Sequence, residues 1–334
     1  MSTVSLGDLA QSYILRRQSL TLKSDIQTLS TELVTGLSAD KAARLSGDFV
    51  PMAAIEASLA RLSAYNAVTS ESGLFAGAIQ TALTTIDEMS SDLGQSLLSA
   101  STSSSPTRIN AVGYDANQRF ESAISVLNTR FGDRSLFAGV ATSGAALVDA
   151  QSIMAALDVV TAGALTAADV ETAISNWFDA PGGFESTAYL GGPAMGSLPI
   201  SPGESARIDV TALDPAIRAT LKGLATAAML NRGILPNSPE ARADLAKRSA
   251  ERLLESQTDR ALLSARLGTT ESQIGAARVR NSSESTALQL ARLEMTALDP
   301  YETASTLEQR QTQLETLFAI TSRMTRLSLV DYLR

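Results

Sequence analysis

Three carboxylates, Asp87, Glu88 and Asp92, lie close enough in sequence to share one face of a helix. Carboxylates gathered on one surface could act as a general acid and base. That chemistry needs a second carboxylate cluster or a pocket, and the sequence shows neither pattern. A solvated helix face is therefore the better interpretation of these three residues.

Two glycine pairs, Gly182-Gly183 and Gly191-Gly192, could in principle cradle a phosphate. Both pairs lie among prolines, and Gly-Pro clusters are typical of turns. The sequence contains neither a phosphate-binding Gly-x-x-x-x-Gly-Lys-Ser/Thr motif nor a dinucleotide-binding fingerprint after a strand. We therefore interpret these glycines as turn residues.

Composition excludes further chemistry. There is no cysteine, which rules out disulfides and thiolate nucleophiles, and no histidine, which removes a common general base and zinc ligand. We therefore expect no catalytic site, no cofactor, no metal and no enzymatic activity. A net charge of −8 without clustered basic residues argues against nucleic-acid binding.

Membrane insertion is not expected either, because no apolar run reaches the roughly 18 residues that a membrane span needs. The first residues, 1–19, are interrupted by Asp8, Gln11, Arg16 and Arg17, so they do not form a Sec-type signal peptide. If the protein is exported, this pattern favours a route without a cleavable signal.

The ends of the chain carry the clearest periodicity. Residues 301–334 contain neither Gly nor Pro. Their apolar residues recur at spacings of three and four, which predicts one apolar stripe along a helix of about 50 Å. Propensity alone rarely stabilises such a helix, so we expect segment 8–35, which has a similar pattern, to be its partner. The expected assembly residues are Leu22, Ile26, Leu29, Leu33, Leu314, Leu317, Ile320, Met324 and Leu327.

Between the ends, two periodic stretches separated by the polar run 99–107 predict a helical hairpin within 46–139. Segment 140–243 holds seven of the ten prolines, which indicates a separate small domain. Its elements are predicted as a helix at 149–160, a helix with a capping box at Thr166 and Asp169, strands near 186–190 and 206–210, and a helix from Asp214.

One heptad frame continues from Pro239 to Leu298. Arg260, Asn281 and Glu284 interrupt this frame. Polar residues at such positions cost stability but can fix the register of a helix pair. The apolar residues that share one position of the frame are Leu253, Leu267, Ile274, Leu288 and Met295.

Together these patterns predict a mainly α fold. Both termini form a long coiled-coil-like helical bundle, and a small α/β or α+β domain is inserted in the middle. The expected divisions are a terminal assembly helix at 1–45 that pairs with 300–334, a helical hairpin at 46–139 that packs with 239–299, an inserted outer domain at 140–238, a returning helix at 239–299 and a terminal assembly helix at 300–334.

Several motifs, taken in order, resemble the flagellin superfamily and within it the hook–filament junction proteins. One departure concerns the Asn-x-x-x-Asp-Asp loop of these proteins, which is reduced here to Ser38-Ala39-Asp40-Lys41 and Gly47-Asp48, so no contacts of that loop are transferred. The similar segments are Leu29 to Gly36, Gly47 to Pro51, Arg134 to Gly139, Tyr189 to Gly192, Ala265 to Gly268, Gln309 to Leu314 and Leu327 to Leu329.

The resemblance implies a structural subunit that forms the junction ring between the flagellar hook and filament. It implies export of the unfolded chain by the flagellar type III apparatus to an extracellular position. The implied partners are further copies of the chain in a ring oligomer, a neighbouring hook-associated protein, flagellin and a flagellar export chaperone.

Two alternatives remain open at this point. The first is filament flagellin, which belongs to the same superfamily but polymerises without limit. The second is a secreted effector or enzyme with its site in the inserted domain.

Overall fold

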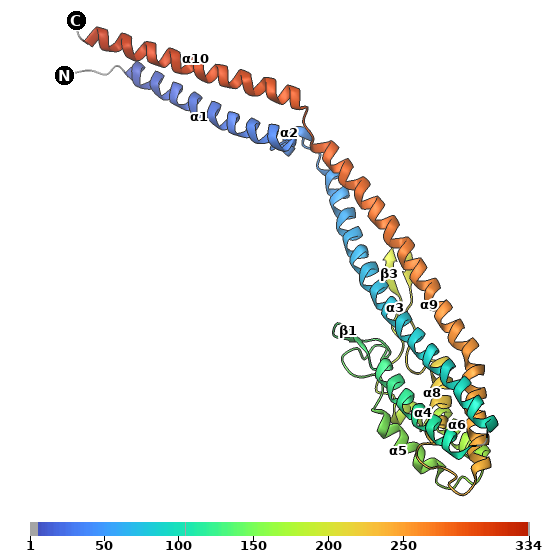
Figure 1. Ribbon diagram of the computed structural model, residues 1–334. Helices are drawn as coiled ribbons and strands as arrows, with labels where there is room; N and C mark the ends of the chain where they lie inside the picture. The colour runs from blue at the N-terminus through green and yellow to red at the C-terminus, as the bar shows by residue number, and fades with distance from the viewer. Residues whose placement is uncertain (1–5, 104, 333–334) are drawn as a thin grey trace. The chain divides into compact units, whose positions relative to one another are not determined.

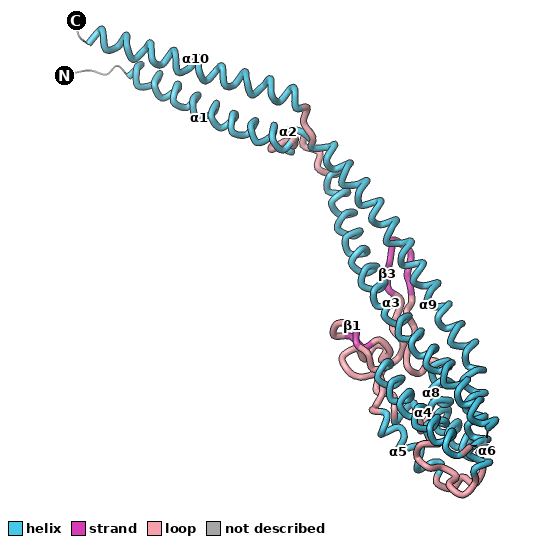
Figure 2. Tube along the Cα trace, viewed as in Figure 1, coloured by secondary structure: helices cyan, strands magenta, loops and turns pink. Residues whose placement is uncertain are grey.

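The computed structural model describes residues 6–103 and 105–332, with side chains for 10–103 and 105–324. Helices dominate it (Figures 1 and 2). The elements are α1 (Leu6–Thr35), α2 (Lys41–Arg44), α3 (Val50–Ser103), α4 (Pro106–Leu127), β1 (Arg130–Phe131), β2 (Arg134–Ser135), α5 (Ala150–Thr161), α6 (Ala167–Asp179), α7 (Phe184–Thr187), β3 (Leu198–Ser201), β4 (Glu204–Ala206), α8 (Pro215–Ala228), α9 (Pro239–Thr296) and α10 (Pro300–Tyr332).

The predicted mainly α class is confirmed. In the described part of the chain, strands occur only as two short antiparallel pairs, β1–β2 and β3–β4, drawn in magenta in Figure 2. Because β3 and β4 pair antiparallel within the inserted segment, that segment is α+β rather than α/β.

Local signals place several helix ends correctly. α1 ends at Thr35, and Gly36 follows with φ of +69°, the left-handed conformation that glycine adopts most easily. Thr166 and Asp169 form the predicted capping box at the start of α6. Asp214 caps α8 ahead of Pro215.

The predicted strand near 186–190 is wrong. Phe184–Thr187 forms the short helix α7, because the Thr187 hydroxyl donates to the carbonyl of Gly183 and the Phe184 side chain is fully buried. Only Tyr189 takes part in a β-bridge, with Leu147. The strand predicted at 206–210 overlaps β4 at one residue and otherwise lies beyond it.

The chain forms two compact units. The terminal unit comprises Met1–Ser63 and Ser283–Arg334, and the central unit comprises Ala64–Ser282. The central unit has one continuous buried cluster to which α3, α4, the inserted segment and α9 all contribute. The largest fully buried side chains of this cluster include Phe120, Phe137, Phe178 and Phe184. Residues 140–238 therefore share a core with the hairpin, while the five-part division of the chain remains a prediction.

The carboxylates 87, 88 and 92 are all accessible to solvent. Glu88 is exposed, and Asp92 lies 4.0 Å from Arg119 at the surface. The side chain of Asp87 is 40 % exposed, and it also forms an ion pair with the buried guanidinium of Arg260 on α9. The sequence did not show this partner, which lies 173 residues away.

Glu171 of α6 connects the inserted segment to α9 through ion pairs. Its carboxylate accepts hydrogen bonds from Arg248, at 3.2 Å, and from Arg252. Burial by itself raises the pKa of Glu171, but the hydrogen bonds and charges of Arg252 and Arg248 outweigh it. The net effect holds the pKa below its ordinary value of 4.5.

Glu171→Gln should lower the unfolding free energy by about 1–2 kcal/mol at neutral pH, because charged hydrogen bonds are worth about 1.5–3 kcal/mol and partial exposure reduces this. Since the folded pKa is lowered, the carboxylate stabilises above the unfolded pKa and loses its effect as the pH falls through the folded value. Urea unfolding of both proteins from about pH 7 to pH 3 measures the difference.

The matched control is Glu251→Gln, which breaks only a surface pair with Lys247 at 3.8 Å. This change should cost less than about 0.5 kcal/mol at any pH. If the loss of unfolding free energy in Glu171→Gln does not become smaller in acid, the ionised carboxylate of Glu171 is not the stabilising group.

Candidate assembly interface

α1 and α10 lie side by side and run antiparallel, in blue and red in Figure 1. Gln11 contacts Met324 near one end of the pair, with 3.9 Å between the amide nitrogen and the sulfur. Further along, the Arg310 guanidinium lies 3.9 Å from the carboxylate of Asp25. The first helix therefore pairs with the last one across 313 residues of sequence.

A two-residue bridge closes the pair at its other end. Leu37 and Ala297 form an isolated antiparallel bridge. The amide of Ser38 donates to the carbonyl of Thr296 at 2.9 Å, and the amide of Leu298 donates to the carbonyl of Gly36 at 3.0 Å. These bonds hold the end of α1 beside the start of α10, and so set which side chains face each other.

The expected assembly residues are only partly covered. Leu22, Ile26 and Leu29 of α1 are half-buried against α10, and Leu33 is exposed. On α10, Leu314, Leu317 and Met324 are half-buried and Ile320 is exposed. The side chain of Leu327 lies outside the described residues.

No apolar side chain of this pair is fully buried among described positions 10–35 and 300–324, where only Glu32 and Thr303 are buried. Full burial of a leucine is worth about 1.5–3 kcal/mol, so each half-buried leucine leaves part of that free energy unrealised. In this pair the two helices do not shield both stripes from water completely. The pair therefore presents apolar surface that a further partner could cover.

α1 carries a second apolar stripe that the sequence reasoning missed. Tyr13, Leu20 and Val34 are 69 %, 63 % and 85 % exposed. They share one heptad position, with Gln27 between them, on the side of α1 away from Leu22 and Leu29. The signal was present in the sequence as a second spacing of seven. This side of α1 also carries Arg17, Ser24 and Thr31, so it is a mixed face with three exposed apolar side chains.

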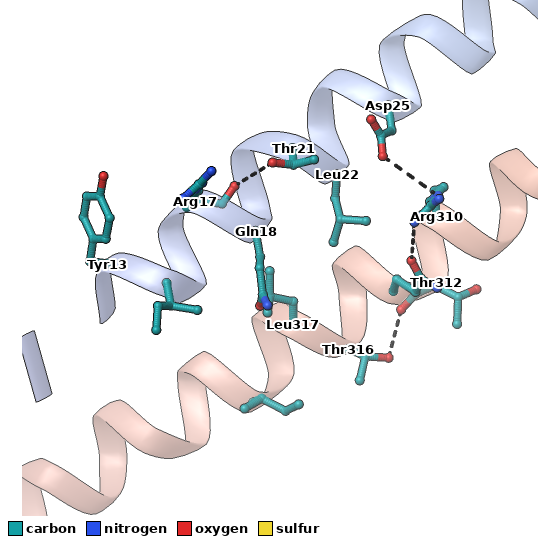
Figure 3. Close-up of a pocket in the computed structure, with 13 residues that line it drawn as sticks. Tyr13, Arg17, Gln18, Thr21, Leu22, Asp25, Arg310, Thr312, Thr316 and Leu317 are labelled. Atoms are coloured by element: carbon teal, nitrogen blue, oxygen red, sulfur yellow. Dashed lines mark hydrogen bonds and ion pairs between the residues drawn. The ribbon is translucent and has the colours of Figure 1, made fainter. Parts of the chain in front are cut away.

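A groove of about 690 Å³ runs along the pair (Figure 3). Figure 3 shows Leu22 and Leu317 pointing into the space between the helices, with the Asp25–Arg310 ion pair at one end. The Lys23 ammonium lies 5.6 Å from the Phe318 ring centre, a cation–π contact across the pair. The walls of the groove combine aliphatic side chains, hydroxyls and amides with the charged side chains of Arg17, Asp25 and Arg310.

Two other kinds of feature are absent from the described residues. No group of acidic side chains within them could hold a metal ion. None of the helices searched has the length and apolar character to cross a membrane. The most prominent unsatisfied feature is thus the apolar surface of α1 and α10.

Comparison with solved structures finds chains of similar fold. One is a flagellar hook-associated protein from Vibrio parahaemolyticus, with a TM-score of 0.53 and 13 % identity, covering 75 % of this chain and 99 % of that one. Another is FlgL from Bacillus cereus, with a TM-score of 0.47 and 13 % identity, covering 72 % of this chain and 100 % of that one. No family model and no curated protein matches the sequence.

The chain has the fold of the Vibrio parahaemolyticus hook-associated protein. The resemblance that the sequence motifs carry is therefore confirmed at the level of fold. The predicted assembly residues and partners are not tested by this likeness.

Leu317→Asp should weaken self-association and leave the central unit folded. The change removes about 1 kcal/mol of apolar burial and adds a carboxylate to the seam, which costs more if a partner covers it. We expect association to require at least about tenfold more protein, as measured by sedimentation velocity. The near-UV signal of Trp177, in the central unit, should not change.

Ser322→Asp is the matched control, because it adds the same charge to an exposed position of α10. Equal effects of both substitutions would mean that charge alone, and not the seam, governs association. Loss of the Trp177 signal in Leu317→Asp would show that the two units do not fold independently.

Proposed function

We propose that this protein is a structural subunit of the bacterial flagellum that forms the junction ring between hook and filament, assembled through coiled-coil pairing of its termini. The observation that carries the proposal is the contrast between the units. The central unit contains one large buried apolar cluster, whereas no apolar side chain of α1 or α10 is fully buried among the described positions.

The shared fold with a hook-associated protein supports this reading. The ring would bury the outer stripe of Tyr13, Leu20 and Val34 and the exposed edge of the groove between neighbouring copies. The partners that we propose are other copies of this chain, a neighbouring hook-associated protein and flagellin. Nucleic acid and membrane insertion have no part in it.

Export in the unfolded state and an extracellular position on the flagellum belong to the same proposal. A chain without cysteine passes through an export channel and refolds without any risk of wrong disulfides. Motility would depend on the protein through the filament that it joins to the hook.

Filament flagellin is the alternative of the same structural class. Unlimited polymerisation of the purified protein would favour flagellin, whereas a short ring favours the junction role. An effector or enzyme with its site in 140–238 is the remote alternative. Against it, three acidic side chains of that segment are occupied by basic partners: Asp158 by Arg232, Glu171 by Arg248 and Arg252, and Asp179 by Lys222.

Deletion of the gene in its native host tests the function. We expect electron microscopy to show hooks that carry no filament, while flagellin is found in the culture medium, because subunits would be exported with no junction to hold them. Complementation with the wild-type chain should restore filaments. Normal filaments on the deletion strain would contradict the junction role, and absence of flagellin synthesis with intact export would favour the flagellin alternative.

We further propose that α10 binds a flagellar export chaperone before export. An exposed amphipathic helix promotes premature self-association, and a groove that takes its apolar face would prevent this. The proposed anchors are Leu314, Leu317, Ile320, Met324 and Leu327.

Pull-down from cytoplasm should recover a small helical chaperone with the full chain and at least about tenfold less with a version that ends at Pro300. Full-length Ser322→Asp should bind normally and serves as the control for charge on this helix. Equal recovery by the shortened version would place the chaperone site elsewhere, and 239–298 would be the next segment to test.

A further inference from the structure

α3 and α9 keep a single antiparallel register through the central unit. The facing positions step by seven residues down α3 and by the same number up α9. The observed pairs are Gly94 with Leu253, where a Cβ on the glycine would lie 3.6 Å from the leucine Cβ, Asp87 with Arg260, where Oδ1 lies 2.6 Å from Nε, and Gly73 with Ile274, where a Cβ would lie 3.8 Å from Cγ2.

Two polar side chains occupy the same heptad position of α9 as Leu253, Leu267 and Ile274. Arg260 is 5 % exposed and Asn281 is 1 % exposed. They lie three heptads apart, so they face the same side of the helix as the leucines. Such residues are seldom fully buried unless every polar group finds a partner.

Arg260 is satisfied by partners on three helices. Its Nε donates to Asp87 of α3 at 2.6 Å. Its Nη1 lies 3.3 Å from the Thr220 hydroxyl of α8, and 2.6 Å from the Ser256 hydroxyl of α9 itself. Its Nη2 lies 3.4 Å from the Ser91 hydroxyl of α3. Only one placement of α3 and α8 against α9 provides all these acceptors.

Asn281 joins α9 to the β3–β4 hairpin. Its Nδ2 donates to the backbone carbonyl of Ile200 at 2.7 Å, and its Oδ1 accepts from the Ser201 hydroxyl at 3.0 Å. Both amide atoms are therefore used within β3. The side chain fixes the position of α9 along a strand as well as along a helix.

A slip of one heptad between α3 and α9 would break these contacts. The facing row of α3 reads Gly94, Asp87, Gln80 and Gly73, so only the two glycines leave room for a large side chain. After the slip, Arg260 would face Gln80 or Gly94, and Asp87 would face Leu267 or Leu253. An unpaired buried guanidinium is strongly unfavourable, and Asp87 would lose its partner.

We propose that Arg260 and Asn281 are two register pins that restrict α9 to one pairing within its own chain. Their role is to select one register of α9 rather than to raise the free energy of unfolding. Leucine at both positions would extend the apolar row from Leu253 to Leu288 without a break. Such a row would permit shifted pairing with α3 and pairing of α9 with a second copy, as an exchanged or parallel coiled coil. In the wild type, parallel self-pairing would oppose two Arg260 charges.

The variant that tests this replaces both pins, Arg260→Leu with Asn281→Leu. The matched control, Arg278→Leu with Gln289→Leu, replaces an arginine and a side-chain amide by leucine at exposed positions of α9. A second version, Arg260→Met with Asn281→Leu, keeps an unbranched side chain close to the length of arginine. Circular dichroism first establishes that each protein is helical.

Register is measured with engineered cysteines, because the chain has none of its own. Gly94→Cys with Leu253→Cys reports the native register, since a Cβ separation of 3.6 Å suits a disulfide. Gly94→Cys with Ala246→Cys reports a slip of one heptad. We expect the second disulfide to be negligible in wild type and control, and at least about fivefold more abundant in the pin variants.

Sedimentation velocity provides the second measurement. The pin variants should form dimers at concentrations where the wild type and the control are monomers. A disulfide pattern and an oligomeric state equal to those of the control would overturn the proposal. Failure of both pin variants to fold would overturn it too, because Arg260 and Asn281 would then be required for folding itself and not for the choice of register.

Discussion

The antiparallel pairing of helices that are distant in sequence is the interaction on which the rest of this structure depends. In the central unit, α3 and α9 pack with one constant register, and α4, α8 and the β3–β4 hairpin add to the same buried cluster. In the terminal unit, α1 and α10 pair in the same antiparallel sense. Small residues at the α3–α9 contact, such as Gly73 and Gly94, allow the two backbones to approach closely.

The two units differ in how completely this pairing removes apolar surface from water. In the central unit the inserted segment covers the remaining faces of the helices, so that Phe120, Phe137 and Phe178 are fully buried. In the terminal unit no apolar side chain of α1 or α10 is fully buried among the described side chains, and Tyr13, Leu20 and Val34 are exposed. Antiparallel helix pairing is therefore accompanied by a large buried core in the central unit and not in the terminal unit.

Local chemistry determined what could be predicted from the sequence. Helix ends marked by Gly36, by the Thr166–Asp169 box and by Pro239 and Pro300 are where the residues place them, because caps and proline act over a few residues. The sequence analysis did not predict strand β3, and it predicted a strand at 186–190 where α7 ends. Short strands depend on tertiary partners such as Asn281. The long helix α3 continues through Gly73, Gly77 and Gly94, since packing outweighs propensity there.

The candidate site was predicted in part. A stripe of three and four spacing located Leu22, Leu29, Leu314 and Leu317 in the seam. The spacing could not show that Leu33 and Ile320 are exposed, because exposure depends on how α1 and α10 curve and on how they are offset along each other. The pairing of Asp87 with Arg260 was equally out of reach, because only the fold brings together residues so far apart in sequence.

That separation has a consequence for the order of folding. The contact between Gln11 and Met324 closes a loop of 313 residues, and the contact between Asp87 and Arg260 closes one of 173. Loop closure is entropically costly and slow compared with local helix formation. A partly emerged chain would contain α1 with its stripes unmatched and no α10 to meet them. The paired surface of α1 and α10 therefore forms only once α10 is available, so the assembly that we propose would require the complete pair.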